Sequence, residues 1–219
     1  MPYVDRSVYT HNVAEAAIHH LFMPWPPERP STARSPLPAA RERILLAAHD
    51  LFYRNGIRAT GVDRVIADAG VTKVTFYRHF PSKNDLVEAF LEYRHGLWMA
   101  WFAAALERQS AAGRPGIAAL APALGAWFRN GGYRGCAFLN TVVELGDVLP
   151  GAGEIARRHK KQMTALIASL LPSSAHRLGD AQAIALAVDG AILRAQMDAS
   201  PTLALKGLKR VVQAITACP

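Results

Sequence analysis

The stretch of this chain that most restricts its fold is TGVDRVIADAGVTKVTFYRHFPSK, residues 60–83. Apolar residues recur at helical spacing before Gly70, and a second short apolar pattern follows it. Gly70 can adopt a positive φ without a steric penalty, so it can end the first helix. The hydroxyl of Thr72 can accept from a free backbone N–H at the start of the second helix, which Pro81 stops. The stretch therefore predicts two short helices joined by a tight turn.

The second of these helices is predicted to expose hydrogen-bond donors and no carboxylate. Val71, Phe76 and Phe80 can turn inward. The side chains left outside are Lys73, Thr75, Tyr77, Arg78 and His79. Such a face suits phosphate groups and base edges in a DNA major groove. An ordinary pair of packed helices with a solvated face is the alternative, and composition alone does not separate the two.

The order of the residues favours the DNA-binding interpretation. The segment GVTKVTFYRHFPSKNDL resembles the recognition helix and linker of the TetR/AcrR family of repressors, and RERILLAAHDLFYRNGIRATGVDRVIADA resembles that family's first two helices. The resemblance covers about fifty residues, from about Ala39 to Ala89. Gly61 stands where the family usually has Ser or Thr, but Gly also caps helices. Ile66 stands where the family often has Ala, which implies different helix packing rather than missing helices.

This resemblance implies an all-α homodimer that binds operator DNA and is released by a small ligand. We expect a Pro-rich, flexible N-terminal extension, a three-helix helix-turn-helix DNA-binding domain, and a C-terminal helical domain for ligand binding and dimerisation. Their predicted ranges are 1–37, 38–85 and 86–219. Besides the two short helices, helices are predicted at 39–55, 82–108, 117–129 with a kink at Pro122, 136–145, 154–171, 180–198 and 201–217, with a loop at 146–153.

The N-terminal extension has no counterpart in the short arm usual for the family. Residues 12–22 have the apolar spacing of a helix, and the Pro-rich run after them predicts an extended or flexible segment. A minor-groove arm that uses Arg29 and Arg34 is the alternative. Met23 is a second candidate start of translation.

Charge supports a nucleic-acid partner only weakly. The formal net charge is +8. Residues 38–88 contain eight Lys and Arg against six Asp and Glu, whereas residues 89–219 contain fourteen against eight. Most of the positive excess therefore lies outside the predicted DNA-binding helices, and the motif carries the argument.

Other functional classes lack their signatures. The two cysteines, Cys136 and Cys218, are far apart and form no disulfide framework or metal-ligand spacing. No apolar run reaches membrane-spanning length and no secretory signal is present, so we expect a cytoplasmic protein without membrane contact. The sequence shows no Gly-rich phosphate loop, nucleophile elbow or paired His–carboxylate motif, which predicts no enzyme activity and no cofactor. A ligand-independent DNA-binding activator and a helical interaction module without DNA affinity remain the alternatives.

The DNA contacts are predicted from the second short helix and its surroundings. Thr72, Lys73 and Thr75 would face base edges. Phosphate contacts are predicted for Tyr77, His79, Lys83 and, from the preceding helix, Thr60.

A small-molecule inducer of unknown identity is predicted to bind among the later helices. The candidate lining is Trp98, Trp101, Phe102, Trp127, Phe128, Phe138 and Met163, with Asn140, Glu144 and His159 as polar contacts. The pattern RGCxFLNxxxE at residues 134–144 resembles the ligand-domain segment of one branch of the family. For any one aromatic residue, core packing is favoured over pocket lining. Cys136 is interpreted as a small core residue, and His159 as a surface histidine in a solvated basic run. A metal held by Glu144, His159 and Asp189 is an alternative that the spacing does not support, so we expect no metal.

The last two predicted helices carry broad apolar faces. These are Ile184, Leu186, Val188, Ile192 and Leu193, then Leu205, Leu208, Val211, Val212 and Ile215. Two such helices need a partner surface, which predicts a homodimer through them. Packing within one subunit is the alternative.

Overall fold

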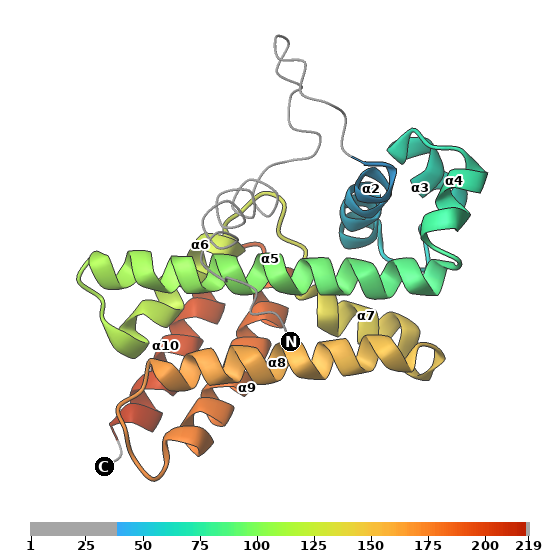
Figure 1. The fold of residues 1–219 in the computed structure, drawn as a ribbon. Helices are drawn as coiled ribbons and strands as arrows, with labels where there is room; N and C mark the ends of the chain where they lie inside the picture. Colours follow the sequence, from blue (N-terminus) through green and yellow to red (C-terminus); the bar gives the residue numbers. More distant parts are fainter. Residues whose placement is uncertain (1–38, 218–219) are drawn as a thin grey trace. The chain divides into compact units, whose positions relative to one another are not determined.

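The computed structural model describes residues 39–217. The predictions for residues 1–37, and for Cys218, lie outside these residues. Across the described range the chain forms α-helices, short 3-10 helices and the turns that join them, which confirms the predicted all-α class (Figure 1).

The helices follow the predicted order with changes at some ends. They are α2 (Ala40–Asn55), α3 (Val62–Ala69), α4 (Lys73–His79), α5 (Lys83–Ala111), η1 (Gly116–Ala119), α6 (Leu120–Phe128), α7 (Ala137–Leu145), η2 (Gly146–Val148), α8 (Pro150–Ser169), α9 (Arg177–Met197) and α10 (Thr202–Thr216).

Two of these elements differ from the sequence prediction, and proline explains both. The predicted helix 117–129 does not kink at Pro122, because the chain divides earlier into η1 and α6, which places Pro122 in the first turn of α6. Proline is tolerated there because the N–H groups of a first turn have no intrahelical partner. The predicted loop 146–153 is also wrong, because α8 begins at Pro150, where proline's fixed φ suits the first helical position.

The described chain divides into two compact units. The N-terminal unit comprises residues 39–95 and 137–157, and the C-terminal unit comprises residues 96–136 and 158–217. Helices α5 and α8 each contribute to both units. Helix α7 and the first part of α8 group with the helix-turn-helix in this division. The predicted domain ranges 38–85 and 86–219 stay predictions.

The core of the N-terminal unit is made where α2, α3 and α4 pack together (Figure 1). Its buried apolar side chains include Ile44, Ala48, Leu51 and Phe52 of α2, Val65 and Ala69 of α3, Phe76, Phe80, and Leu86 and Phe90 of α5. Phe76 and Phe80, predicted to face inward, are thus buried, whereas Val71 is half-buried. Their removal from water supplies the main driving force for assembling these helices, of which α3 and α4 are too short to be stable alone.

The turns between these helices follow the predicted local chemistry. Gly56 follows α2 with φ +88°, and Gly70 follows α3 in the left-handed region at φ +61°. Thr72 caps α4 by accepting a hydrogen bond from the N–H of Thr75. Ser82 caps α5 in the same way, accepting from the N–H of Asp85 at 3.2 Å.

Arg43, near the start of α2, has a structural role. Its Nε donates to the carbonyl oxygen of Ala69 at 3.1 Å. A cation at the C-terminal end of α3 is favoured by the helix dipole and satisfies a carbonyl that has no partner within the helix. Arg43 therefore fixes the end of α3 against α2.

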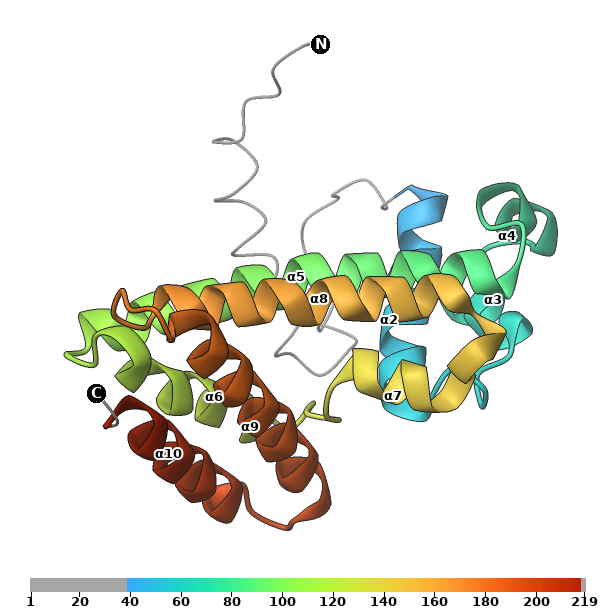
Figure 2. The same ribbon diagram turned by 90° about the horizontal axis from the view of Figure 1, so that it is seen from below.

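The C-terminal unit is built largely from α6, α9 and α10, and α9 and α10 lie side by side (Figure 2). Ile184, Val188 and Ile192 of α9 and Leu208 and Val212 of α10 are buried. The hydroxyl of Tyr133 donates to the carbonyl oxygen of Ile192 at 2.6 Å. The apolar faces of the last two helices are thus partly covered within one chain.

Candidate nucleic-acid interface

Helix α4 presents a polar face to solvent while its apolar face is buried. Lys73, Tyr77 and Arg78 are exposed, whereas Phe76 is completely buried. Thr75 and His79 are half-buried. The exposure of Lys73, Tyr77 and Arg78 agrees with the sequence prediction for α4, whereas Thr75 and His79 are less exposed than predicted.

The start of α4 is held by its two threonines. The hydroxyl oxygens of Thr72 and Thr75 lie 2.9 Å apart, and Thr72 also accepts from the backbone of Thr75. These bonds fix both hydroxyls at the exposed N-terminal end of the helix. Lys73, beside them, lies 3.9 Å from a carboxylate oxygen of Asp63. Since both side chains are well exposed, this ion pair is worth little and is easily exchanged for a contact with DNA.

Val74 was missed by the sequence analysis. Its side chain is 70% exposed on α4. An exposed aliphatic residue on a helix that otherwise carries donors can contact the methyl group of thymine in a major groove. Its place two residues before buried Phe76, which puts it on the opposite side of the helix, is the signal in the sequence that could have indicated its exposure.

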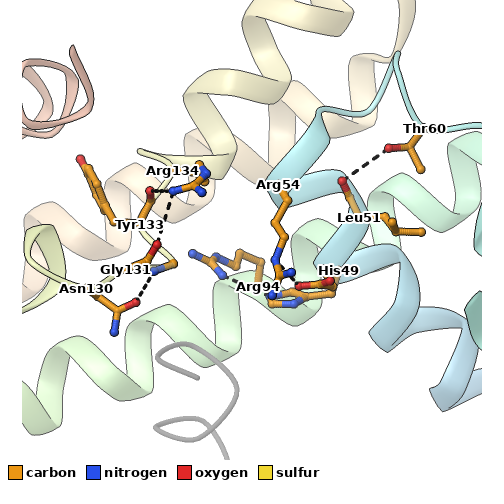
Figure 3. Close-up of polar contacts among 11 residues, drawn as sticks. His49, Leu51, Arg54, Thr60, Arg94, Asn130, Gly131, Tyr133 and Arg134 are labelled. Atoms are coloured by element: carbon orange, nitrogen blue, oxygen red, sulfur yellow. Dashed lines mark hydrogen bonds and ion pairs between the residues drawn. The ribbon is translucent and has the colours of Figure 1, made fainter. Parts of the chain in front are cut away.

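Thr60 lies inside the N-terminal unit. Its residue is 3% exposed and its hydroxyl donates to the carbonyl oxygen of Gly56 at 2.8 Å. Figure 3 shows the same hydroxyl directed at the carbonyl of Leu51, at 3.4 Å. The hydroxyl thus satisfies carbonyls at the C-terminal end of α2, a geometry that does not favour the predicted phosphate contact.

Lys83 is also drawn into the loop between α2 and α3. Its ammonium donates to the carbonyl oxygen of Ile57 at 2.6 Å, and lies 6.0 Å from the centre of the Phe52 ring. Burial lowers the pKa of the Lys83 ammonium, and the nearby Glu144 carboxylate opposes that shift. The predicted phosphate contact therefore competes with an internal hydrogen bond.

Glu144 reaches this loop from α7. One of its carboxylate oxygens, Oε2, accepts from the N–H of Ile57 at 2.8 Å and from the N–H of Arg58 at 2.9 Å. The Nε of Arg58 donates in turn to the backbone carbonyl of Glu144 at 2.5 Å. Glu144 was predicted to be a ligand contact instead. Its contact with this loop could not be predicted, because nothing in the local sequence pattern indicates a partner so far away in the chain.

A second buried cluster of the N-terminal unit surrounds Arg94, which is 2% exposed. Its guanidinium lies 3.8 Å from the centre of the Tyr53 ring. Figure 3 shows its contact with His49, in which Nη1 of Arg94 lies 3.2 Å from Nε2 of the histidine. Stacking on tyrosine suits the planar, weakly hydrated guanidinium. The cluster ties α2 to α5.

The predicted ligand residues fall into both units. Phe138, Asn140 and Glu144 belong to α7 of the N-terminal unit, where the ring of Phe138 lies 6.4 Å from that of His95. Those in the C-terminal unit are Trp98, Trp101, Phe102, Trp127, Phe128, His159 and Met163.

An aromatic cluster centred on Trp98 occupies the C-terminal unit. The ring of Trp98 lies 4.6 Å from Phe102, 5.7 Å from Trp127 and 5.0 Å from His159. His159 is 2% exposed, so its reading as a surface histidine is wrong. Within residues 39–217 the indole N–H of Trp98 is one of the buried polar groups without a hydrogen-bond partner. Leaving such a donor unsatisfied costs about 1–3 kcal/mol.

A cavity of about 280 Å³ lies elsewhere in the C-terminal unit. Residues of α5, η1 and α8 line it, including Leu106, Glu107, Gly116 and Leu166, together with Leu170 just after α8. None of the predicted ligand contacts is among its lining residues.

Comparison with known proteins identifies the family. Residues 44–90, which contain α3, α4 and most of α2, match the model of the bacterial regulatory proteins of the tetR family. The chain belongs to the TetR family. The match covers the helices whose residues carried the resemblance.

Curated relatives of this TetR-family chain are similar over the same region. The HTH-type transcriptional activator FasR of Mycolicibacterium smegmatis is 40% identical over 62 residues, 28% of each chain. An HTH-type transcriptional repressor of Mycobacterium tuberculosis is 39% identical over 69 residues, 30% of this chain and 37% of its own. The matches thus span well under half of these relatives.

Solved structures extend the likeness over most of the chain. A TetR-family transcriptional regulator from Streptomyces coelicolor superposes with a TM-score of 0.70 at 29% identity, covering 81% of this chain and 90% of its own. The multidrug binding protein EbrR, complexed with malachite green, has a TM-score of 0.61 at 22% identity, with coverages of 80% and 98%. The latter likeness shows the shared fold.

The described part of the chain was also considered for metal-binding side chains and membrane-spanning helices. Among residues 39–217, no cluster of three or more His, Cys, Asp or Glu side chains could hold a metal ion. In the same range, no helix combines the length and apolar character needed to cross a membrane.

Proposed function

We propose that this TetR-family chain is a DNA-binding transcriptional regulator, and that it acts as a dimeric repressor on a palindromic operator. A small ligand would release it from the DNA. In this proposal the protein acts in the cytoplasm and catalyses no reaction. The observation that carries the proposal is α4, a short helix whose donors face solvent while Phe76 anchors it in the core. Its similarity to the helix-turn-helix regions of named regulators supports the same conclusion.

Each α4 would enter a major groove, with the two copies about one helical turn apart on the DNA. Thr72, Lys73 and Thr75 would face base edges, because they lie at the N-terminal end of the helix. Tyr77 and His79, further along, would contact phosphate. We assign Thr60 and Lys83 mainly to holding the loop between α2 and α3, on the basis of their internal hydrogen bonds.

The outward face of α9 supports the dimer. Leu186, Leu193 and Met197 are 75%, 54% and 67% exposed, and their spacing places them on one side of the helix. Gly190 lies on the same side and allows a second backbone to approach closely. An apolar stripe of this kind fits a second copy of itself, and two half-sites on DNA require two copies.

The aromatic cluster around Trp98 supports a ligand role for the C-terminal unit. Its unsatisfied indole N–H would be best paired by a ligand that carries a hydrogen-bond acceptor on an aromatic or otherwise apolar frame. EbrR, which shares the fold, holds malachite green. A small core-packed cluster without a ligand remains the simpler role for each ring taken alone.

The proposal is tested by selecting bound sequences from random duplex DNA with the purified full chain at one stated salt concentration. We expect a palindrome to be enriched, with Lys73→Ala shifting or weakening the enrichment. Salt-sensitive binding without any enriched sequence would contradict a specific regulator and favour a helical interaction module.

Activation is the second candidate function, because one of the named relatives is a transcriptional activator. The selected operator placed upstream of a reporter promoter separates the two. Reporter output that falls when the protein is expressed indicates repression, and output that rises indicates activation. Release by small molecules is then screened on the same reporter.

A further inference from the structure

We infer that Glu144 is a positioning residue for DNA recognition, which acts by fixing the loop that joins α2 to α3. The inference rests on the proposed function, since it assigns a residue outside the helix-turn-helix to the operation of that site. It concerns residues 56–60 and α7, which all belong to the N-terminal unit.

The carboxylate of Glu144 binds two successive backbone N–H groups. Oε2 accepts from Ile57 and Arg58 at 2.8 and 2.9 Å. Successive N–H groups of a turn form a concavity suited to an anion, and a charged acceptor strengthens both bonds. This pair of bonds therefore sets the path of the chain as it leaves α2.

Gly56 makes room for the carboxylate. Its φ of +88° requires glycine, and a Cβ placed there would lie 3.0 Å from Oε1 of Glu144. One carboxylate oxygen thus lies over the backbone of Gly56 while the other binds the next two N–H groups. The sequence provides both halves of the contact, the glycine on one side and the acid on the other.

The remaining polar groups of the loop are held by neighbours of the same contact. Arg58 returns a hydrogen bond to the backbone of Glu144, and Lys83 at the start of α5 binds the carbonyl of Ile57. The loop leads directly into α3, which packs on α4. A loop held from α7 and α5 therefore fixes the position of the helix that supports the proposed recognition helix.

The direction in which DNA affinity changes when the carboxylate is removed distinguishes this positioning role from a simple electrostatic one. A carboxylate near a DNA-binding surface repels phosphate, so removing it should by itself tighten binding to every DNA sequence. If Glu144 instead positions the loop, removing it should weaken binding to the selected operator. The two roles predict changes of opposite direction.

The test compares Glu144→Ala, Glu144→Gln and the matched control Glu154→Ala in the full chain. Glu154 is an exposed acid on α8 of the same unit, so its replacement makes the same change of charge. Amide hydrogen exchange at Ile57 and Arg58, thermal unfolding, and affinity for operator and for random DNA are measured on each variant.

We expect Glu144→Ala to speed exchange at the two amides about tenfold and to weaken operator binding about tenfold, with little change on random DNA. Glu144→Gln keeps an acceptor oxygen without the charge and should fall between Glu144→Ala and the wild type. Operator affinity in Glu144→Ala equal to or tighter than that of the wild type and of Glu154→Ala overturns the inference. Failure of the wild-type chain to select any sequence instead overturns the proposed function, so the two failures are distinguishable.

Discussion

The ammonium group of Lys83 donates a hydrogen bond to the carbonyl oxygen of Ile57 at 2.6 Å. Because Lys83 closely follows α4 in the chain, the sequence predicts that its ammonium contacts a DNA phosphate. The structure shows that the same group closes the loop between α2 and α3, beside the ring of Phe52. A cation so placed contributes first to the stability of the N-terminal unit.

Lys83→Met is expected to lower the free energy of unfolding by about 1 kcal/mol, because it removes the hydrogen bond but keeps the apolar stem. Urea denaturation measures this loss. The slope of DNA affinity against salt should change little. An unaltered unfolding free energy together with a slope reduced by about one ion would restore the phosphate role.

Lys73→Ala is expected to weaken operator binding by about 1–3 kcal/mol while leaving affinity for random DNA nearly unchanged. Lys73 is exposed at the start of α4, and its ion pair with Asp63 is too exposed to matter for stability. Competition binding with operator and random duplexes at one salt concentration measures the affinity for each DNA. Lys161→Ala, an exposed lysine on α8, is the control for loss of one positive charge. Equal loss on both DNAs would contradict base reading by Lys73.

Local chemistry explains why the helix-turn-helix could be predicted from sequence. Gly70, Thr72 and Pro81 act on their immediate neighbours, so the turn, the cap and the end of α4 follow from adjacent residues. The burial of Phe76 and the exposure of Lys73 follow in the same way from helical spacing.

Contacts between distant residues could not be predicted in this way. Glu144 is 87 residues from Ile57 in the chain, so the sequence around either residue does not indicate the contact between them. His159 lies within a run of charged residues, yet its ring is buried against Trp98. In both cases the role of the side chain depends on a residue that only the tertiary fold brings next to it. The residues adjacent in the sequence do not indicate that partner.

Gly56→Ala is expected to destabilise the chain by more than about 1 kcal/mol, and by more than Gly70→Asn. Gly56 combines φ +88° with ψ 156°, a region essentially confined to glycine, and an added Cβ would press on Glu144. Gly70 has left-handed helical angles that asparagine tolerates, and no atom lies within 4 Å of an added Cβ. Thermal unfolding of the two variants provides the comparison, and equal melting temperatures would contradict this account.

Tyr93→Phe is expected to make the chain less sensitive to alkaline pH. Burial raises the pKa of Tyr93 from 10.0 to about 12, with a smaller contribution from Glu42 in the same direction and an opposing one from Arg94. Between these pH values the folded chain keeps the proton while the unfolded chain loses it, so the free energy of unfolding falls as pH rises. Urea denaturation at about pH 9 and about pH 11 should show a smaller fall for Tyr93→Phe than for the wild type. Tyr77→Phe, at an exposed tyrosine, should retain the wild-type fall.

Leu186→Glu is expected to convert the proposed dimer to a monomer. Leu186 is 75% exposed and shares the outward face of α9 with Leu193 and Met197, so its replacement should leave the core of one chain intact. A dimer would instead bury two opposed carboxylates in an apolar contact, which is strongly unfavourable. Light scattering after size exclusion measures the mass, and circular dichroism confirms retained helix. Ala165→Glu, at an exposed position of α8, supplies the matched charge control. Because a dimer engages both half-sites at once, the monomer should also lose affinity for the palindrome far more than for a single half-site. A dimeric Leu186→Glu protein would exclude this face of α9 as the centre of the interface.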